Sequence, residues 1–201
     1  MTTPHDHLRS DARLGPLVER YGRLDLDPAE DMFRRLVVSV LRQQVSMASA
    51  EATRKRLFEA VEVTPSGVLA ADRETLRDCG LSRQKTDYVR NVAEAFADEY
   101  DREYFEGLDD GAVVEELTTI KGVGEWTARM QLLFTLGRPD VFPVGDLGVR
   151  KGMWALFFEE MTREEMLTEA ERWAPHRSYA TLYLWRIEED VVEAVEEVTE
   201  R

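Results

Sequence analysis

Two glycines separated by one residue stand between two helix-forming segments, and they constrain the fold more than any other feature of this chain. Gly122 and Gly124 follow the apolar residues Leu117 and Ile120, and an apolar, helix-prone segment over 126–136 comes directly after them. Glycine adopts positive φ without steric cost, so this spacing predicts a helix, a very tight turn and a second helix. The first backbone amides of that second helix would point out of the turn, where they are able to hold a phosphate group.

An acidic residue stands beyond the second of these helices. Asp146 follows the sequence Pro143-Val144-Gly145, which predicts a kinked loop, and precedes a segment that is helix-prone to about Phe158. An aspartate in this position is often only a cap whose carboxylate accepts hydrogen bonds from the first helical turn. The spacing by itself therefore leaves two interpretations open, a capping residue and a functional acid.

The periodicity of the apolar residues predicts the fold class. It is near 3.6 throughout, and strict alternation is almost absent, so we expect an all-α protein. After ten frayed residues, a first helix is expected over 11–21 and another from the sequence Asp27-Pro28-Ala29-Glu30. The acidic tail over 188–201 is expected to form an exposed helix. Further helices are expected to begin at three capping residues, Ser46, Ser82 and Thr162.

The composition excludes several classes of protein. A chain of 201 residues, 43% of them hydrophobic, is long enough to bury a core. It contains no run of about eighteen apolar residues, and its N-terminus lacks the basic-then-apolar pattern of a signal peptide. We therefore expect no membrane segment and a cytoplasmic location. The single cysteine, Cys79, excludes an internal disulfide and a cysteine-ligated zinc or iron–sulfur site.

The charge balance argues against a nucleic-acid partner at first sight. Asp and Glu number 40 against 26 Lys and Arg, which gives a net charge of −14, and only four of the 26 bases are lysine. Phosphate contacts need positive charge. One interpretation is an acidic protein that meets no polyanion. The other, which we favour, is a protein adapted to molar salt, since its acid-rich, lysine-poor composition resembles that of salt-loving archaea. In molar salt the Debye length is about 3 Å, so long-range charge repulsion is screened and only local contacts count.

Four segments in order along the chain together resemble one family. The pattern LxxIxGVGxxTA over 117–128 is a helix-hairpin-helix. With Asp146, it resembles the helix-hairpin-helix (HhH-GPD) DNA glycosylase superfamily, and within it the branch of DNA-3-methyladenine glycosylase II (AlkA-like). The resemblance covers about residues 30–186. The other three segments that carry it are LRQQVSxxSA over 41–50, CGLSxxKxxY over 79–88 and ERWxPxRSYAxxYLW over 171–185.

The resemblance implies a fold of two all-helical lobes with a DNA-binding cleft between them. One lobe would cover about 33–138, including the hairpin, and the other about 11–32 together with 139–201. The chain resembles the compact form of the branch, which has no N-terminal β domain. The implied partner is double-stranded DNA containing a damaged base, and we expect the protein to be a monomer.

The resemblance also implies a reaction. Members of the branch remove alkylated bases, chiefly 3-methyladenine and related purines, by flipping the base and hydrolysing its N-glycosidic bond. Asp146 aligns with the catalytic aspartate, where a carboxylate stabilises the cation that develops at C1′ and orients or deprotonates water. Because the motif matches on both sides of Asp146, we favour catalysis over capping alone.

Trp126 predicts the subclass. Members that also cut the strand carry a lysine at this position, which forms a Schiff base with the sugar. The tryptophan therefore predicts a monofunctional enzyme that uses water as its nucleophile. No cofactor is expected to be required, since the chain lacks the four cysteines that hold the iron–sulfur cluster of some relatives.

Three residues are expected to line a pocket for the flipped base: Trp126, Trp185 and Met130. An alkylated purine carries positive charge on its ring, which an indole face attracts by stacking and cation–π contact. For both tryptophans the alternative is plain core packing. Met130 stands where the branch often has another aromatic residue, and this departure leaves the shape of the pocket and its range of substrates open.

The resemblance assigns other residues to the DNA. Gln44 stands where the family inserts a wedge into the gap left by the flipped base, with an ordinary polar helix end as the alternative. The lysines support a DNA contact despite the net charge, because three of the four lie within or beside the motifs. The residues expected to contact DNA are Gln43, Gln44, Ser46, Arg83, Lys85, Lys121, Gly122, Val123, Gly124, Arg150 and Lys151. A monovalent cation, Na⁺ or K⁺, is expected on the backbone carbonyl oxygens of Thr118, Ile120 and Val123.

Two other functions remain open. The same scaffold could act on deaminated or oxidised bases. The chain could also be a non-catalytic module that binds abasic or bulged DNA and releases no base, although such a module has no need of Asp146.

Overall fold

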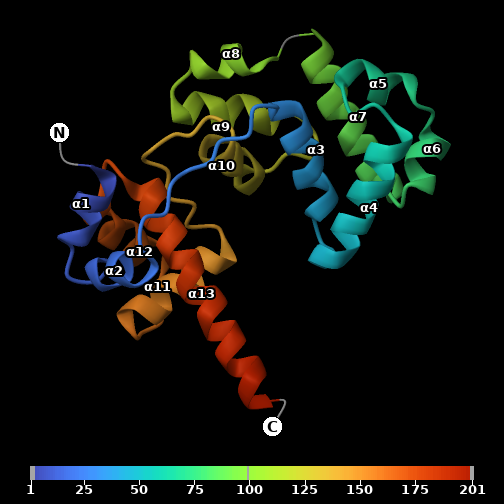
Figure 1. The fold of residues 1–201 in the computed structure, drawn as a ribbon. Coiled ribbons are helices and arrows are strands. Elements are labelled where there is room, and N and C mark those ends of the chain that lie inside the picture. The colour runs from blue at the N-terminus through green and yellow to red at the C-terminus, as the bar shows by residue number, and fades with distance from the viewer. Residues whose placement is uncertain (1–2, 99, 200–201) are drawn as a thin grey trace. The chain divides into compact units, whose positions relative to one another are not determined.

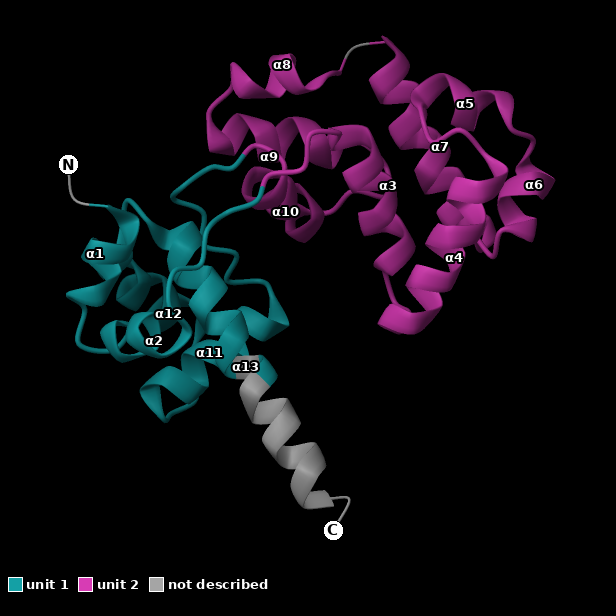
Figure 2. Ribbon diagram, in the orientation of Figure 1, with its two compact units in different colours: residues 1–27, 137–201 teal, residues 28–136 magenta. Residues whose placement is uncertain are grey.

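The computed structural model describes residues 3–98 and 100–199, with the side chains of 188 and 190–199 left undescribed. Within that part of the chain, α-helices and one 3₁₀ turn account for all regular structure, and no strand occurs (Figure 1). The expected all-α class is therefore confirmed. The chain divides into two compact units (Figure 2): unit 1 is residues 1–27 with 137–201, and unit 2 is residues 28–136.

Unit 1 is built from both ends of the chain. Its elements are α1 (Pro4–Arg9), α2 (Gly15–Tyr21), α11 (Leu147–Phe157), α12 (Arg163–Ala170), the 3₁₀ turn η1 (Glu171–Trp173) and α13 (Arg177–Thr199). Helices α11 and α13 pack closely, because a Cβ atom at Gly152 would lie 2.4 Å from the carbonyl oxygen of Leu184. The core is apolar and includes Leu8, Leu14, Val18, Phe142, Val149, Met153, Met166, Trp173, Tyr183 and Leu184.

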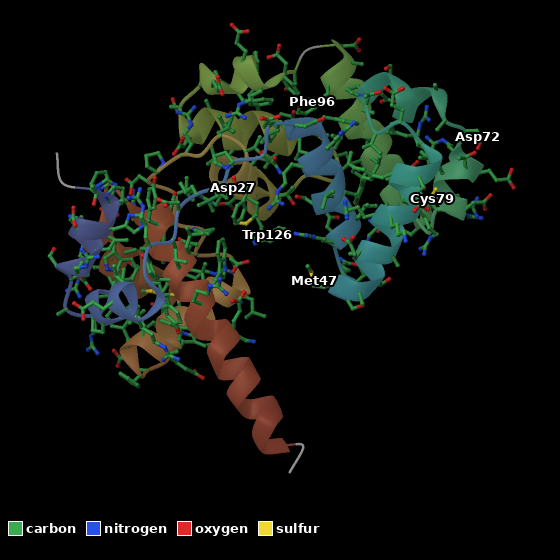
Figure 3. All side chains as sticks on the ribbon, in the orientation of Figure 1. Asp27, Met47, Asp72, Cys79, Phe96 and Trp126 are labelled. Atoms are coloured by element: carbon green, nitrogen blue, oxygen red, sulfur yellow. The ribbon has the colours of Figure 1, made fainter. Side chains whose placement is uncertain are left out.

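Unit 2 contains the central helices. They are α3 (Met32–Arg42), α4 (Met47–Ala60), α5 (Pro65–Ala70), α6 (Arg73–Asp78), α7 (Arg83–Asp98), α8 (Arg102–Glu106), α9 (Asp110–Thr119) and α10 (Glu125–Phe134). The apolar stripe of α3 is buried, from Phe33 to Leu41. Phe96 of α7 (Figure 3) packs against the rings of Phe33 in α3 and Phe105 in α8.

Local capping signals located several helix starts correctly. The hydroxyl of Ser46 accepts a hydrogen bond from the amide of Ser49 (3.2 Å) at the start of α4. The hydroxyl of Ser82 accepts one from the amide of Lys85 (3.2 Å) at the start of α7. Thr162 and Glu165 form the expected capping box of α12. For the acidic tail, α13 continues to Thr199, but most of its side chains lie outside the described residues.

The N-terminal expectations need two corrections. Residues 4–9 form α1 and are not frayed, because Thr3 and Asp6 make a capping box and Leu8 is buried in unit 1. The following helix begins at Gly15, not at Asp11. The carboxylate of Asp11 instead accepts the amides of Arg13 (2.8 Å) and Leu14 (2.9 Å), which stabilises a turn.

The start of α3 also differs from the expectation. The helix begins at Met32, and its cap is Asp31, whose carboxylate accepts the amide of Arg34 (2.9 Å). The amide of Ala29 donates to the carbonyl of Phe134 (2.7 Å), which draws the expected first turn into an extended segment. Unit 2 begins at Pro28, whereas the resemblance implies a lobe boundary at about residue 32. In the described part of the chain, no helix is long and apolar enough to cross a membrane.

Candidate functional site

The turn between α9 and α10 requires glycine at one of its two glycine positions. Gly122 has φ of 110°, in the left-handed region that favours glycine. It also packs against Tyr88 of α7, since a Cβ atom at 122 would lie 2.3 Å from the Tyr88 ring. Both the backbone conformation and the close approach therefore exclude a larger residue at position 122.

Gly124 has a different role from the one that the paired spacing predicts. Its φ of −96° is open to any residue, and a Cβ atom added there would meet nothing within 4 Å. Gly124 is the N-cap of α10 and makes no side-chain cap hydrogen bond. Because the first amides of a helix lack intrahelical acceptors, a glycine here leaves them accessible to an anion. The missing side chain at position 124 therefore leaves the first amides of α10 accessible, and it is not needed for the tightness of the turn.

Two side chains from other helices hold the turn by its carbonyl oxygens. The Gln43 side-chain amide at the end of α3 donates to the carbonyl of Gly122 (2.9 Å). The Asn91 side-chain amide in α7 donates to the carbonyl of Lys121 (2.9 Å). Within the turn, the amide of Val123 donates to the carbonyl of Ile120 (2.9 Å). The predicted DNA residue Gln43 thus supports the hairpin directly, while the Lys121 side chain is exposed.

The structure brings together the two segments over 41–50 and 79–88. Between them lies a recess of about 340 Å³ whose lining includes Gln43, Gln44, Val45, Ser82, Gln84, Lys85 and Tyr88. Gln44 is exposed and has φ of 57°, which is unusual for a residue other than glycine. Such local strain is common at functional positions. Ser46 and Arg83 are exposed nearby in the sequence, at the starts of α4 and α7.

Lys85 is partly committed to the fold. Its ammonium group donates to the carbonyl of Leu41 (2.6 Å), near the C-terminal end of α3. A cation is favourable there because the helix dipole places partial negative charge at that end. Burial lowers the pKa of the Lys85 ammonium. The side chain therefore joins α7 to α3 and borders the recess at the same time.

The predicted pocket residues of unit 2 differ in exposure. Trp126 in the first turn of α10 is 39% exposed, so it is not an ordinary core residue (Figure 3). Met130, one turn later, is only 4% exposed and is part of the core of unit 2. Of the two, the indole of Trp126 is the side chain that has surface available for a ligand.

Asp146 in unit 1 is both a cap and the partner of a tryptophan. It is the N-cap of α11, and its Oδ1 accepts the amide of Val149 (2.9 Å). The same oxygen accepts the indole N–H of Trp185 in α13, also at 2.9 Å. The capping interpretation is therefore correct, but it does not describe the whole environment, because a second donor 39 residues away converges on the carboxylate.

The loop that leads to Asp146 is anchored to the start of α13. The Arg177 guanidinium pairs with Asp140 (2.8 Å), and the Ser178 hydroxyl donates to the carbonyl of Arg138 (2.6 Å) and accepts the amide of Val141 (2.8 Å). Burial opposes ionisation of Asp140, but its hydrogen bonds with Arg177 prevail, so the pKa of its carboxyl is lowered. These contacts join two residues of the C-terminal motif, Arg177 and Ser178, to the loop that precedes Asp146.

The remaining predicted positions are less distinctive. On α11, Arg150 is half-buried and Lys151 is exposed. The carbonyl oxygens of Thr118, Ile120 and Val123 are of the type that hard cations prefer, and each has two lone pairs. The one used by the turn, that of Ile120, retains acceptor capacity. Among the side chains that the structure describes, no three His, Cys, Asp or Glu groups gather to hold a metal.

Sequence reasoning missed three supporting residues. Tyr88 stands in the 79–88 motif, which is a weak signal for the ring that packs on Gly122. Asn91 and Gly148 had no signal, because each acts on a residue that only the fold brings close. A Cβ atom at Gly148 would lie 2.8 Å from Cδ1 of Trp185 and 3.2 Å from Oδ1 of Asp146.

Over most of its length the chain is similar to DNA repair proteins. Residues 37–176 match the HhH-GPD superfamily of base excision DNA repair proteins. The DNA-3-methyladenine glycosylase 1 of Schizosaccharomyces pombe is 33% identical over 183 residues, which span 87% of this chain and 80% of that protein.

Two solved structures share the fold closely. The 3-methyladenine DNA glycosylase of the same yeast, in complex with abasic DNA, aligns with a TM-score of 0.82 at 31% identity, over 91% of this chain and 95% of that one. A DNA-3-methyladenine glycosidase from Bacillus halodurans aligns with a TM-score of 0.85 at 32% identity, over 99% of this chain and 97% of that one.

Proposed function

The chain belongs to the HhH-GPD superfamily of base excision DNA repair proteins, and we propose on this premise that it is a DNA glycosylase that excises alkylated bases from double-stranded DNA. The resemblance carried by the four sequence segments is thereby confirmed. The proposed substrates are 3-methyladenine and related alkylpurines, the class for which the relatives above are named. The product is an abasic site.

The observation that carries the proposal is the oriented carboxylate of Asp146. A cap needs one hydrogen bond from the helix, whereas Asp146 Oδ1 also accepts the indole N–H of Trp185. Breaking the N-glycosidic bond leaves positive charge on C1′ of the sugar. A carboxylate held in one orientation stabilises this charge without reorganising, and it orients or deprotonates the attacking water. Alkylation makes the purine a good leaving group, so no strong general acid is required.

Unit 2 supplies the binding functions in this proposal. The amides at the start of α10, next to Gly124, bind a DNA phosphate. Trp126 offers an exposed indole face to the charged base. Gln44 is the wedge residue, and the exposed Arg83 and Lys121 side chains contribute local positive charge in an otherwise acidic chain. A monovalent cation at the hairpin carbonyls would add a further positive charge beside the phosphate.

Five further properties belong to this proposal. The enzyme is monofunctional, since Trp126 occupies the position where a lysine would form a Schiff base. It acts as a monomer in the cytoplasm and needs no cofactor. It works at high salt, where the net charge of −14 no longer repels DNA at long range.

The decisive experiment replaces Asp146 by asparagine. Asparagine caps helices as well as aspartate does, and its amide oxygen accepts the same two hydrogen bonds, so Asp146→Asn removes the charge and little else. We expect release of 3-methyladenine from alkylated duplex DNA to fall by on the order of 10²–10³ or more, with binding to abasic DNA retained. Full activity in this variant would refute the assignment.

A matched control makes the same chemical change at another helix cap. Asp101 caps α8 by accepting the amide of Tyr104 (2.8 Å), and α8 contributes no site residue. Asp101→Asn should leave base release unchanged.

Alkylated, deaminated and oxidised substrates assayed side by side, at low and molar salt, distinguish the alternative lesion classes. Binding to abasic DNA without release of any base would instead indicate the non-catalytic module.

A further inference from the structure

Gly148 lies under the indole that contacts Asp146. It is in the first turn of α11, two residues after the cap, and a Cβ atom there would lie 2.8 Å from Cδ1 and 3.1 Å from Nε1 of Trp185. The same atom would lie 3.2 Å from Oδ1 of Asp146. Even a methyl group would therefore enter the space in which the indole and the carboxylate meet, and the ring would have to move.

The hydrogen bond from the Trp185 indole restricts the orientation of the Asp146 carboxylate more than the helix cap does alone. The Val149 amide and the Trp185 indole N–H converge on the same oxygen, each at 2.9 Å. A single donor leaves the carboxylate able to rotate about its terminal bond, whose torsion is broad. Two donors from α11 and α13 select one orientation. Loss of the indole contact would leave the cap intact and remove one of the donors that fix the orientation of the carboxylate.

A second glycine on the same helix separates this effect from helix packing. Gly152 is one turn after Gly148 on the same face of α11, and its missing side chain accommodates the backbone of Leu184, not an indole. A methyl group at 152 would push α11 and α13 apart. The three atoms nearest to a methyl group at 148 belong to the Trp185 ring and the Asp146 side chain. The two positions therefore predict different consequences, instability for one and misorientation for the other.

We propose that Gly148 is a positioning residue for base release: by carrying no side chain, it lets the indole of Trp185 reach Asp146 and hold its carboxylate in one orientation. This inference rests on the proposed function of Asp146. Since a displacement of about 1 Å in a catalytic group costs up to about 10²-fold in rate, a small change at 148 should have a large kinetic effect.

The test is a double-mutant cycle between positions 148 and 185. Gly148→Ala, Trp185→Phe and the double variant are compared by single-turnover release of 3-methyladenine and by binding to abasic DNA. We expect Gly148→Ala to slow release by about 10- to 100-fold without changing DNA affinity or folding. In the Trp185→Phe background the same alanine should have no further effect, because the contact that it disturbs is already gone.

Two kinetic outcomes would overturn the proposal. One is a Gly148→Ala rate within about twofold of the wild type. The other is a double variant in which the two losses multiply, which would mean that Gly148 does not act through Trp185. Gly152→Ala serves as the packing control and should lower the midpoint of unfolding.

A spectroscopic readout keeps the inference separate from the proposed function. The Trp185 indole N–H resonance, assigned by its disappearance in Trp185→Phe, should move in Gly148→Ala because its hydrogen bond to Asp146 is lost. This measurement needs no activity. If the wild type releases no base from any substrate, the proposed function fails. An unchanged indole resonance in Gly148→Ala would show instead that the positioning contact does not depend on Gly148.

Discussion

Replacing Gly122 by alanine tests whether the hairpin turn depends on two independent constraints. The first is conformational, because φ at Gly122 is 110°, and a left-handed conformation costs other residues about 1–2 kcal/mol. The second is steric, because the new Cβ would lie 2.3 Å from the ring of Tyr88, and overpacking of a core costs about 1–3 kcal/mol. Together the structure predicts that Gly122→Ala lowers the free energy of unfolding by about 2–5 kcal/mol.

Denaturant unfolding measures this loss directly. The midpoint should fall while the slope stays constant, as expected when stability changes without a change in the surface exposed. A second substitution separates the two terms. In a Tyr88→Ala background the ring is absent, so Gly122→Ala should then cost only the conformational part, about 1–2 kcal/mol. A loss below about 0.5 kcal/mol in the native background would refute both terms, since that is the range of ordinary surface substitutions.

Gly124→Ala is the matched comparison, one residue past Val123. Its φ is −96° and its Cβ position is open, so we expect a change in stability of no more than about 1 kcal/mol. The methyl group would nevertheless stand beside the first amides of α10. Affinity for abasic DNA should therefore fall more in Gly124→Ala than in a stability-matched variant elsewhere. The reverse pattern, in which position 124 affects folding and position 122 does not, would contradict the assigned roles.

The other predictions concern chemistry, pH and the anchoring of the loop before Asp146. Borohydride added during base release should trap no protein–DNA adduct, and a trapped adduct would disprove the monofunctional assignment of Trp126. Burial and the neighbouring His7 lower the pKa of the His176 ring, so the folded state binds fewer protons than the unfolded chain and stability should fall as the pH drops below about 6.5. His176→Gln should reduce the fall in melting temperature between about pH 8 and pH 5, and an unchanged fall would exclude His176 as its source. Arg177→Met leaves the carboxylate of Asp140 without its cation and should cost about 2 kcal/mol in denaturant unfolding, whereas a neutral effect would mean that water replaces the ion pair.

The sequence was informative where a structural feature depends on neighbouring residues. Ser46 and Thr162 cap helices through residues three positions away, so their patterns are visible in a short window. The positive φ at Gly122 was likewise predicted from the turn pattern alone. The start of α3 was wrong because the amide of Ala29 bonds to the carbonyl of Phe134, a contact over more than a hundred residues that competes with the local helix signal.

In the candidate site, too, the sequence predicted single residues but not the contacts between residues that are distant in the chain. Asp146 was identified by motif resemblance, but its second donor, Trp185, lies 39 residues away, and spacing does not reveal a hydrogen bond between them. Gly148 appeared as one more glycine in a helix. Lys85 was assigned to DNA from its position in a motif, whereas its hydrogen bond to Leu41 depends on how α7 packs against α3.

The hairpin turn is joined to its surroundings by Gln43 from α3 and by Tyr88 and Asn91 from α7. These helices would have to shift before the turn could lose its shape, so a phosphate held at the turn stabilises more than the turn itself. Ligand binding to the folded state alone raises stability by RT ln(1 + [L]/Kd), which is about 2.7 kcal/mol at a hundredfold excess over Kd. DNA bound as proposed would thus slow amide hydrogen exchange in α3 and α7 and stabilise unit 2 against unfolding beyond the turn itself.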